Sequence, residues 1–207
     1  HYNEFEKQNG KILSDNLIWA ITKLKLNMTR MPNWQENIKV KTWAPFVDKY
    51  FAYRNFEIMD EKDNIIGKST FNWVIIDVLN KKTVIPTEFS DRWQFHKTPL
   101  FFELKGKIER ITTPEKSREI TVSYLDIDVN NHVNNVRYIH WIIDCIDFKI
   151  LKEKVIKDIE VNFLAEAVIN DRLDINIQKF NNSALYLGNV IRKEDNRELC
   201  RAKILFG

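Results

Sequence analysis

The stretch from Val133 to Leu151 constrains the fold more than any other part of the chain. Its apolar residues recur at helical spacing on almost every side. Its polar residues form one narrow stripe: Arg137, His140, Asp144 and Asp147. A helix that is apolar on most sides must be buried on most sides. In a protein of 207 residues, a curled sheet wrapped around the helix would bury it.

Segments with a two-residue alternation of apolar and polar side chains surround this helix and predict β-strands. Nine strands are expected, at residues 17–31, 38–43, 50–59, 65–79, 118–127, 155–164, 172–180, 184–191 and 198–206. The first four are joined by short turns, which predicts an antiparallel meander.

The two halves of the chain follow one pattern. Tyr2, Phe5 and Gly10 are spaced like the last turns and stop of a helix, so each half has a helix followed by about four strands. We infer an internal duplication of α+β type: two antiparallel sheets, each wrapped around a central helix. The expected units are residues 1–80 and 118–207. Residues 81–117 would be a connector that crosses the surface and packs through aromatic side chains, namely Trp93, Phe95, Phe101 and Phe102.

The composition narrows the function classes. A net charge of +3 does not predict nucleic-acid binding, and no run of about 20 apolar residues predicts a membrane span. The two cysteines, Cys145 and Cys200, lack metal-ligand spacing, which favours a reduced, cytoplasmic protein over one with a disulfide. Neither a metal nor a cofactor is expected.

Polar residues crowd together where the strand before the helix meets the helix. If residues 128–132 stay extended, the two-residue repeat puts Asp128, Asn130 and His132 on one face, which would form a catalytic constellation. The structural alternative is also open: Asp128 and Asn130 would be turn and cap residues, and His132 a hydrogen-bonded structural histidine.

The segment from Asp126 to Asn135, followed by Tyr138, Ile139 and Trp141, resembles the signature of acyl-ACP thioesterases. These are double hot-dog enzymes known from plant plastids and from bacteria. The likeness covers nearly the whole chain and includes further positions: Asn16 to Trp19, Pro32, Trp34, Thr42, Trp43, Lys49, Arg54, Ile85 and Pro86. The resemblance implies a double hot-dog fold in which the chain lacks its first strand and most of its first-half helix.

The resemblance also assigns the site. Asp128, Asn130 and His132 take the family's catalytic positions, and Glu166 matches a catalytic glutamate. The next position is a cysteine in many plant members but is Ala167 here, so a thiol mechanism cannot operate through it. Neither Cys145 in the helix nor Cys200 in the last strand is a convincing substitute.

Thioester hydrolysis needs an attacking water, a base and a place for the oxyanion. We expect Glu166, oriented by His132, to activate water. Asn130 would orient the water or the thioester carbonyl, and Asp128 would fix the motif through backbone N–H groups or by holding His132. Direct attack by Glu166, through an anhydride, is the rival route.

The oxyanion and the acyl chain also need binding sites. The backbone N–H of Val133 or Asn134, at the helix start, is the expected oxyanion donor. The acyl chain needs an apolar slot, for which the first half offers candidates: Trp19, Ile21, Trp43, Phe71 and Trp73. Ordinary core packing is the alternative for each of them.

The resemblance predicts that the chain hydrolyses fatty acyl-ACP and ends chain elongation. Acyl carrier protein is acidic, so a basic surface should receive it, and the candidates are Lys23, Lys25, Arg30, Lys39, Lys41 and Arg137. Two alternatives stay open, an acyl-CoA thioesterase and a non-catalytic acyl-ligand-binding hot-dog protein. The acyl length and the oligomeric state, with a homodimer as one option, do not follow from the sequence.

Overall fold

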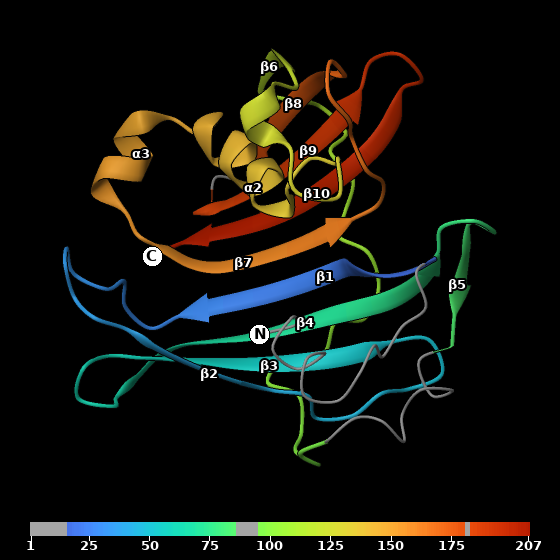
Figure 1. Ribbon diagram of the computed structural model, residues 1–207. Coiled ribbons are helices and arrows are strands. Elements are labelled where there is room, and N and C mark those ends of the chain that lie inside the picture. The colour runs from blue at the N-terminus through green and yellow to red at the C-terminus, as the bar shows by residue number, and fades with distance from the viewer. Residues whose placement is uncertain (1–15, 86–94, 181–182) are drawn as a thin grey trace.

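The computed structural model describes residues 16–85, 95–180 and 183–207, which form one antiparallel sheet of ten strands with two helices and a 3-10 turn (Figure 1). The predicted N-terminal helix and Trp93 lie outside the described residues. The strands are β1 (Leu17–Met28), β2 (Lys39–Trp43), β3 (Ala52–Met59), β4 (Ile65–Asp77), β5 (Lys82–Val84), β6 (Lys116–Thr121), β7 (Ile156–Phe163), β8 (Arg172–Lys179), β9 (Leu185–Arg192) and β10 (Arg197–Phe206).

The strands are ordered β2-β3-β4-β1-β7-β10-β9-β8-β6, and β5 pairs with β4. The two expected sheets are therefore joined edge to edge, because β1 pairs with β4 on one side and with β7 on the other. The predicted meander is correct for β2, β3 and β4 but wrong for β1, which does not pair with β2. The overall architecture is the expected hot-dog type, while the division into two units stays a prediction.

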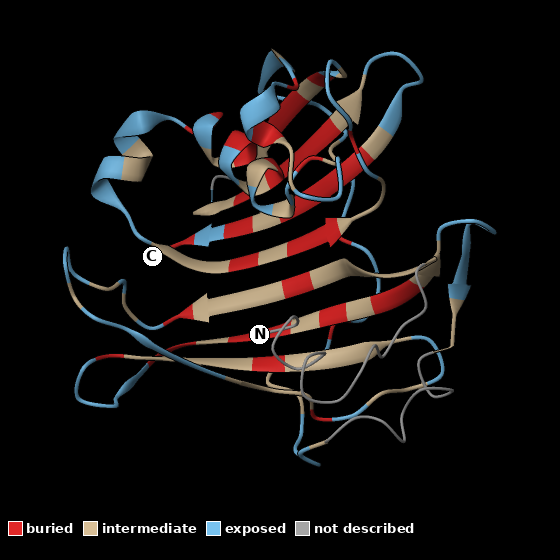
Figure 2. Cartoon of the chain, in the orientation of Figure 1, coloured by how far each residue is buried: buried red, intermediate tan, exposed pale blue. Residues whose placement is uncertain are grey.

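Only the second half of the sheet carries a described helix across one face, and that face is called the inner face below. Helix α2 (Asn135–Asp144) lies over β8, β9 and β10, with Tyr138, Trp141 and Ile142 buried (Figure 2). Gly188 of β9 allows the close approach, because a Cβ there would lie 2.3 Å from a methyl carbon of Ile142.

The single long helix predicted from Val133 to Leu151 is wrong in two respects. The chain breaks after α2 and restarts as α3 (Phe148–Glu153), because the Asp147 side chain caps α3 by accepting from the Lys149 N–H. Burial is also one-sided, since Val136 is 50% exposed and Phe148 is 77% exposed. The sheet therefore covers one side of the helical segment and does not enclose it.

Described residues of the predicted connector lie against the outer face of the sheet, which is the face opposite α2. The connector backbone meets a row of polar side chains: Asn55 donates to the Pro99 carbonyl, and Asn162 accepts from the Ile108 N–H at 2.8 Å. Arg201 donates to the Ile108 carbonyl at 2.7 Å. These bonds explain why the outer face buries polar residues where the inner face buries apolar ones.

Candidate active site

The motif before α2 is a tight turn and not an extended strand. The Asp128 N–H donates to the His132 carbonyl at 2.8 Å, and the Asn131 N–H donates to the Asp128 carbonyl at 3.1 Å. Asn131 adopts a φ of 61°, which asparagine tolerates better than most residues. The Asp128 carboxylate accepts from the Asn130 N–H at 2.8 Å. The prediction that alternation aligns Asp128, Asn130 and His132 is therefore wrong, although the turn still holds all three close together.

A buried ion pair anchors this turn to the helix. The Asp126 side chain is 5% exposed and accepts from Arg137 Nε at 2.6 Å and from the Ser123 N–H and hydroxyl. Burial opposes ionisation of Asp126, but the hydrogen bonds from Ser123 and the charge of Arg137 outweigh it, so its pKa lies below the usual range. The sequence placed Arg137 on the polar stripe of the helix without showing this partner.

The structure brings His132 and Glu166 together from segments 34 residues apart. His132 Nε2 lies 3.3 Å from Glu166 Oε2, with 34% and 54% of the two side chains exposed. An imidazole and a carboxylate in contact, both open to water, can hold and polarise a water molecule. This contact joins a catalytic candidate of the turn, His132, to the catalytic candidate of the segment after β7, Glu166.

The segment that carries Glu166 follows β7 and is held by three residues that sequence reasoning did not assign to the site. Arg192 Nη1 donates to the Glu166 carbonyl at 3.3 Å and pairs with Asp171 at 3.4 Å. On the other side, the buried Tyr138 hydroxyl accepts from the Ala167 N–H at 2.9 Å. Burial raises the pKa of Tyr138, so the phenol stays protonated. No local sequence pattern signals these contacts.

The expected oxyanion donors are both occupied. The Val133 N–H donates to the Ala167 carbonyl at 2.9 Å, and the Asn134 N–H donates to the Asp126 carbonyl at 2.8 Å. In this structure neither group is available to a substrate, so that prediction is wrong. The reason is that the turn and the Glu166 segment fold back over the helix start and take its donors.

The cysteines are as unsuitable for catalysis as expected. Cys145 is 1% exposed and Cys200 is fully buried, and burial raises the pKa of both thiols. A thiol with a raised pKa supplies little thiolate near neutral pH. Ala167 is also fully buried, beneath the site.

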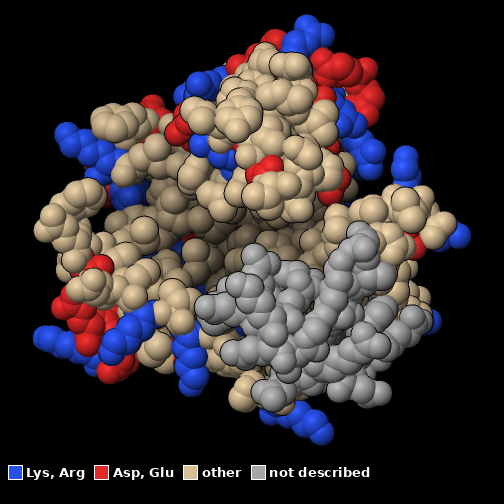
Figure 3. Space-filling model, in the orientation of Figure 1, with Lys and Arg blue, Asp and Glu red and all other residues tan. Residues whose placement is uncertain are grey.

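The register of the strands sorts the acyl-slot candidates onto two faces. Trp19 lies opposite Ile75 and Ile21 opposite Trp73, so these side chains share the inner face with Phe71. Figure 3 shows this side of the molecule hollowed between the half that carries α2 and the strands of the first half. The binding of an acyl chain by these residues stays a prediction.

Trp43 does not belong to that set. Its backbone pairs with Asn55, which faces outward, and its indole N–H donates to the Thr98 hydroxyl of the connector at 2.8 Å. Its ring packs on Phe101 with centroids 5.5 Å apart. The prediction that Trp43 lines an inner slot is wrong, because β2 presents Thr42 to the inner face instead.

Most of the basic residues proposed to receive a carrier have partners within the chain. Lys23 donates to the carbonyls of Leu104 and Gly106, and Lys39 lies 2.6 Å from Asp63. Arg30 pairs with Glu36 and Asp60, and Arg137 with Asp126. These groups therefore do not form an unpaired basic patch.

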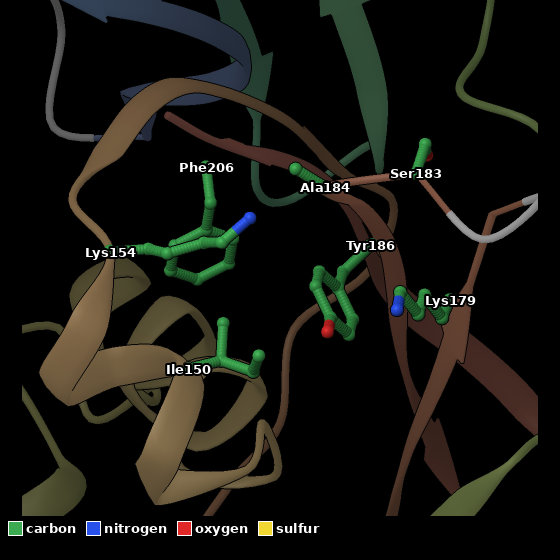
Figure 4. A pocket seen from close by; sticks show the side chains of 7 residues that line it. All are labelled: Ile150, Lys154, Lys179, Ser183, Ala184, Tyr186 and Phe206. Carbon is green, nitrogen blue, oxygen red and sulfur yellow. The ribbon is translucent and has the colours of Figure 1, made fainter.

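Two hollows lie away from the His132–Glu166 pair. One of about 90 Å³ lies beside α3 and is lined by Lys154, Tyr186 and Phe206 among others (Figure 4). It is near the start of β7, whereas Glu166 follows its end, roughly 25 Å along the strand. A second, of about 270 Å³, lies between the outer face and Phe101. Neither contains a candidate catalytic residue.

Within the described ranges, no group of three or more His, Cys, Asp or Glu side chains is arranged to hold a metal ion. No helix in that part of the chain is long and apolar enough to cross a membrane.

Two family models match the chain. The acyl-ACP thioesterase N-terminal domain matches residues 2–92, and the acyl-ACP thioesterase C-terminal domain matches residues 109–207. A palmitoyl-acyl carrier protein thioesterase of Gossypium hirsutum is 27% identical over 73% of this chain and 38% of its own length. An oleoyl-acyl carrier protein thioesterase of Coriandrum sativum is 26% identical over 77% of this chain and 46% of its own. The chain thus spans less than half the length of these curated relatives.

Solved structures agree on the fold. An acyl-ACP thioesterase from Bacteroides thetaiotaomicron superposes with a TM-score of 0.85 at 25% identity, over 100% of this chain and 84% of that one. A 12:0-ACP thioesterase from Umbellularia californica gives a TM-score of 0.82 at 19% identity, over 93% and 76%. The second likeness concerns the fold alone.

Proposed function

Because the chain belongs to the acyl-ACP thioesterase family, we propose that it hydrolyses the thioester of fatty acyl-ACP, releasing a free fatty acid and ending chain elongation. The observation that carries the proposal is the contact between His132 and Glu166 at 3.3 Å, in a part of the surface open to water. A carboxylate and an imidazole at this distance can act as a general base and as the group that orients the base.

In the proposed reaction, Glu166 is the general base and His132 orients it. Water attacks the thioester carbonyl carbon and gives its proton to the Glu166 carboxylate. The C–S bond then breaks, and the departing thiolate takes up this proton from Glu166, which becomes a carboxylate again. In the rival route Glu166 itself attacks and forms an anhydride. After a single turnover in ¹⁸O-labelled water, heavy oxygen in the Glu166 side chain would establish the anhydride route, because it enters there only when water attacks an anhydride at the Glu166 carbonyl.

The turn residues have supporting roles in this scheme. Asp128 holds the turn by accepting from the Asn130 N–H, which is one of the two roles expected from the sequence. The Asn130 side chain is exposed and makes no hydrogen bond to the described residues. We assign its amide to the thioester carbonyl, since the N–H groups of Val133 and Asn134 are occupied. Asn130→Ala should then reduce kcat by about 100-fold or more.

The central test is a pair of substitutions. Glu166→Gln and His132→Ala should each reduce acyl-ACP hydrolysis by at least about tenfold, with folding intact by circular dichroism. His140→Ala, an exposed histidine of α2, is the matched control and should retain full turnover. Full activity in both site variants would refute the assignment of Glu166 and His132 as catalytic residues.

Acyl carrier protein is the proposed carrier of the substrate. The same preparation assayed with acyl-ACP and with acyl-CoA of equal chain length decides between this proposal and an acyl-CoA thioesterase. Binding of both without release of fatty acid would favour a non-catalytic acyl-binding protein. A homodimer and a cytoplasmic location stay predictions.

A further inference from the structure

The inner face of the first-half strands is mostly apolar, but it also carries the hydrogen-bond donors of the Arg54 and Trp73 side chains. The pairing register places Arg54 directly opposite Phe71, and Trp73 is the next residue of β4 on the same face. Arg54 and Trp73 are therefore diagonal neighbours, with Cα atoms roughly 7–8 Å apart.

The indole N–H of Trp73 is buried and has no hydrogen-bond partner among the residues that the structure describes. Such groups are rare in folded proteins, because a buried donor without an acceptor loses its bonds to water and gains nothing in return. Trp43, on the outer face, shows the usual arrangement, since its N–H reaches the Thr98 hydroxyl at 2.8 Å.

Arg54 is also under-satisfied. Its Nε donates to the Thr42 hydroxyl at 2.9 Å, and among the described residues no carboxylate pairs with it. Burial lowers the pKa of its guanidinium, because desolvation disfavours the charged form. Other arginines of the chain do pair with carboxylates: Arg30, Arg137, Arg192 and Arg201.

Together the two side chains offer an indole N–H and a guanidinium fork on an apolar surface. That combination suits an oxygen acceptor, and the fork matches a carboxylate best. We infer that this part of the inner face is a subsite for an acyl chain that carries an oxygen function, preferably a terminal carboxylate. The inference rests on the proposed function, because it places the acyl chain on this face.

The position of the subsite indicates which part of the acyl chain it would contact. Trp73 pairs with Ile21 of β1, and β1 pairs with β7, whose end leads to Glu166. Two strand spacings, roughly 10 Å, therefore separate the Trp73 backbone from the end of β7. The oxygen would lie well away from the thioester, on the distal part of the acyl chain.

The kinetic test compares unsubstituted, ω-hydroxy and ω-carboxy acyl-ACP of equal chain length, over a series of lengths. The ω-carboxy chain should have the higher kcat/KM by about tenfold or more, the scale of one hydrogen bond to a charged group. Arg54→Met and Trp73→Phe should bring this ratio close to one. Trp43→Phe removes an indole N–H from the opposite face and should leave the ratio unchanged. A wild-type ratio at or below one overturns the subsite and leaves the proposed function standing.

A second measurement does not depend on turnover. In protein labelled with ¹⁵N at the indole nitrogens, the Trp73 signal is identified by its loss in Trp73→Phe. A long-chain dicarboxylate should shift that signal, and the monocarboxylate of equal length should shift it less. Equal shifts, or none, refute the subsite. A structural water would then be the acceptor for the Trp73 indole N–H.

Discussion

The buried pair of Asp126 and Arg137 gives the most direct quantitative test of how the site is held. Asp126→Asn keeps the shape of the side chain but removes its charge. The amide would also place an NH₂ group, or an uncharged oxygen, against the donors of Ser123 and Arg137. At least one of those donors would then lose its acceptor.

The magnitude follows from the contacts. One hydrogen bond to a charged group contributes about 1.5–3 kcal/mol, and breaking a buried ion pair costs about 3–5 kcal/mol. Asp126 is 5% exposed, but Arg137 is 37% exposed and can regain water. We therefore expect the low end of the second range, a loss of about 3 kcal/mol in the free energy of unfolding.

Denaturant unfolding at pH 7 measures this loss. Asp144→Asn is the control, because Asp144 lies on the same helix, is 63% exposed and is 3.9 Å from Arg118. That change should stay within about 0.5 kcal/mol of the parent protein. Equal stabilities of the two variants would refute the anchoring role of Asp126.

The pH dependence has a definite sign. The folded-state pKa of Asp126 is depressed, so its contribution is fully present above the unfolded value of about 3.9 and is lost as pH falls through the folded value. The stability gap between the parent protein and Asp126→Asn should therefore narrow below about pH 4. A gap that stays constant down to that range would show that the effect of the substitution is steric.

Three further predictions concern other parts of the site. Gly188→Ala should cost about 1–3 kcal/mol in unfolding free energy, because the new methyl meets Ile142; an unchanged denaturation midpoint would show that α2 can shift. Arg192→Gln should lower kcat more than it changes KM, because it removes the hydrogen bond that holds the Glu166 carbonyl. Arg192→Lys should recover part of the loss, and equal activity of Arg192→Gln and the parent would refute this role. Cys200→Ser should retain its turnover per folded molecule, and a loss of turnover at normal stability would revive a thiol mechanism.

The strands were predictable because alternation is encoded locally. Eight of the nine expected strands agree with the structure to within three residues at each end, and β1 even resumes its alternation after a bulge between Ile21 and Lys23. The exception is the strand expected at 118–127, which ends at Thr121 and continues as a 3-10 turn at Tyr124–Asp126. Local alternation could not reveal that β1 lies between β4 and β7, because edge pairing depends on contacts between distant segments.

The site shows the same difference between features that are encoded locally and contacts between distant segments. The motif located His132, but its internal geometry depends on an Asx-type turn that competes with the extended form. The contact of Arg192 with Glu166 spans 26 residues and has no local signature. The prediction for Trp43 fails because neighbouring strand residues point to opposite faces, so a one-residue difference in register decides which face a side chain occupies.

The way the site is held also decides how its substitutions should be interpreted. Three backbone bonds fix the turn and the Glu166 segment: Val133 N–H to the Ala167 carbonyl, Asn134 N–H to the Asp126 carbonyl and Asp128 N–H to the His132 carbonyl. None of them needs the side chain of His132 or Glu166, and both side chains are partly exposed. Glu166→Gln should therefore keep the melting temperature within about 2 °C of the parent while turnover falls. Asp126→Asn should lower the melting temperature as well. If Glu166→Gln instead melted as early as Asp126→Asn, the His132–Glu166 contact would be part of the scaffold, and its loss of activity would not identify the base.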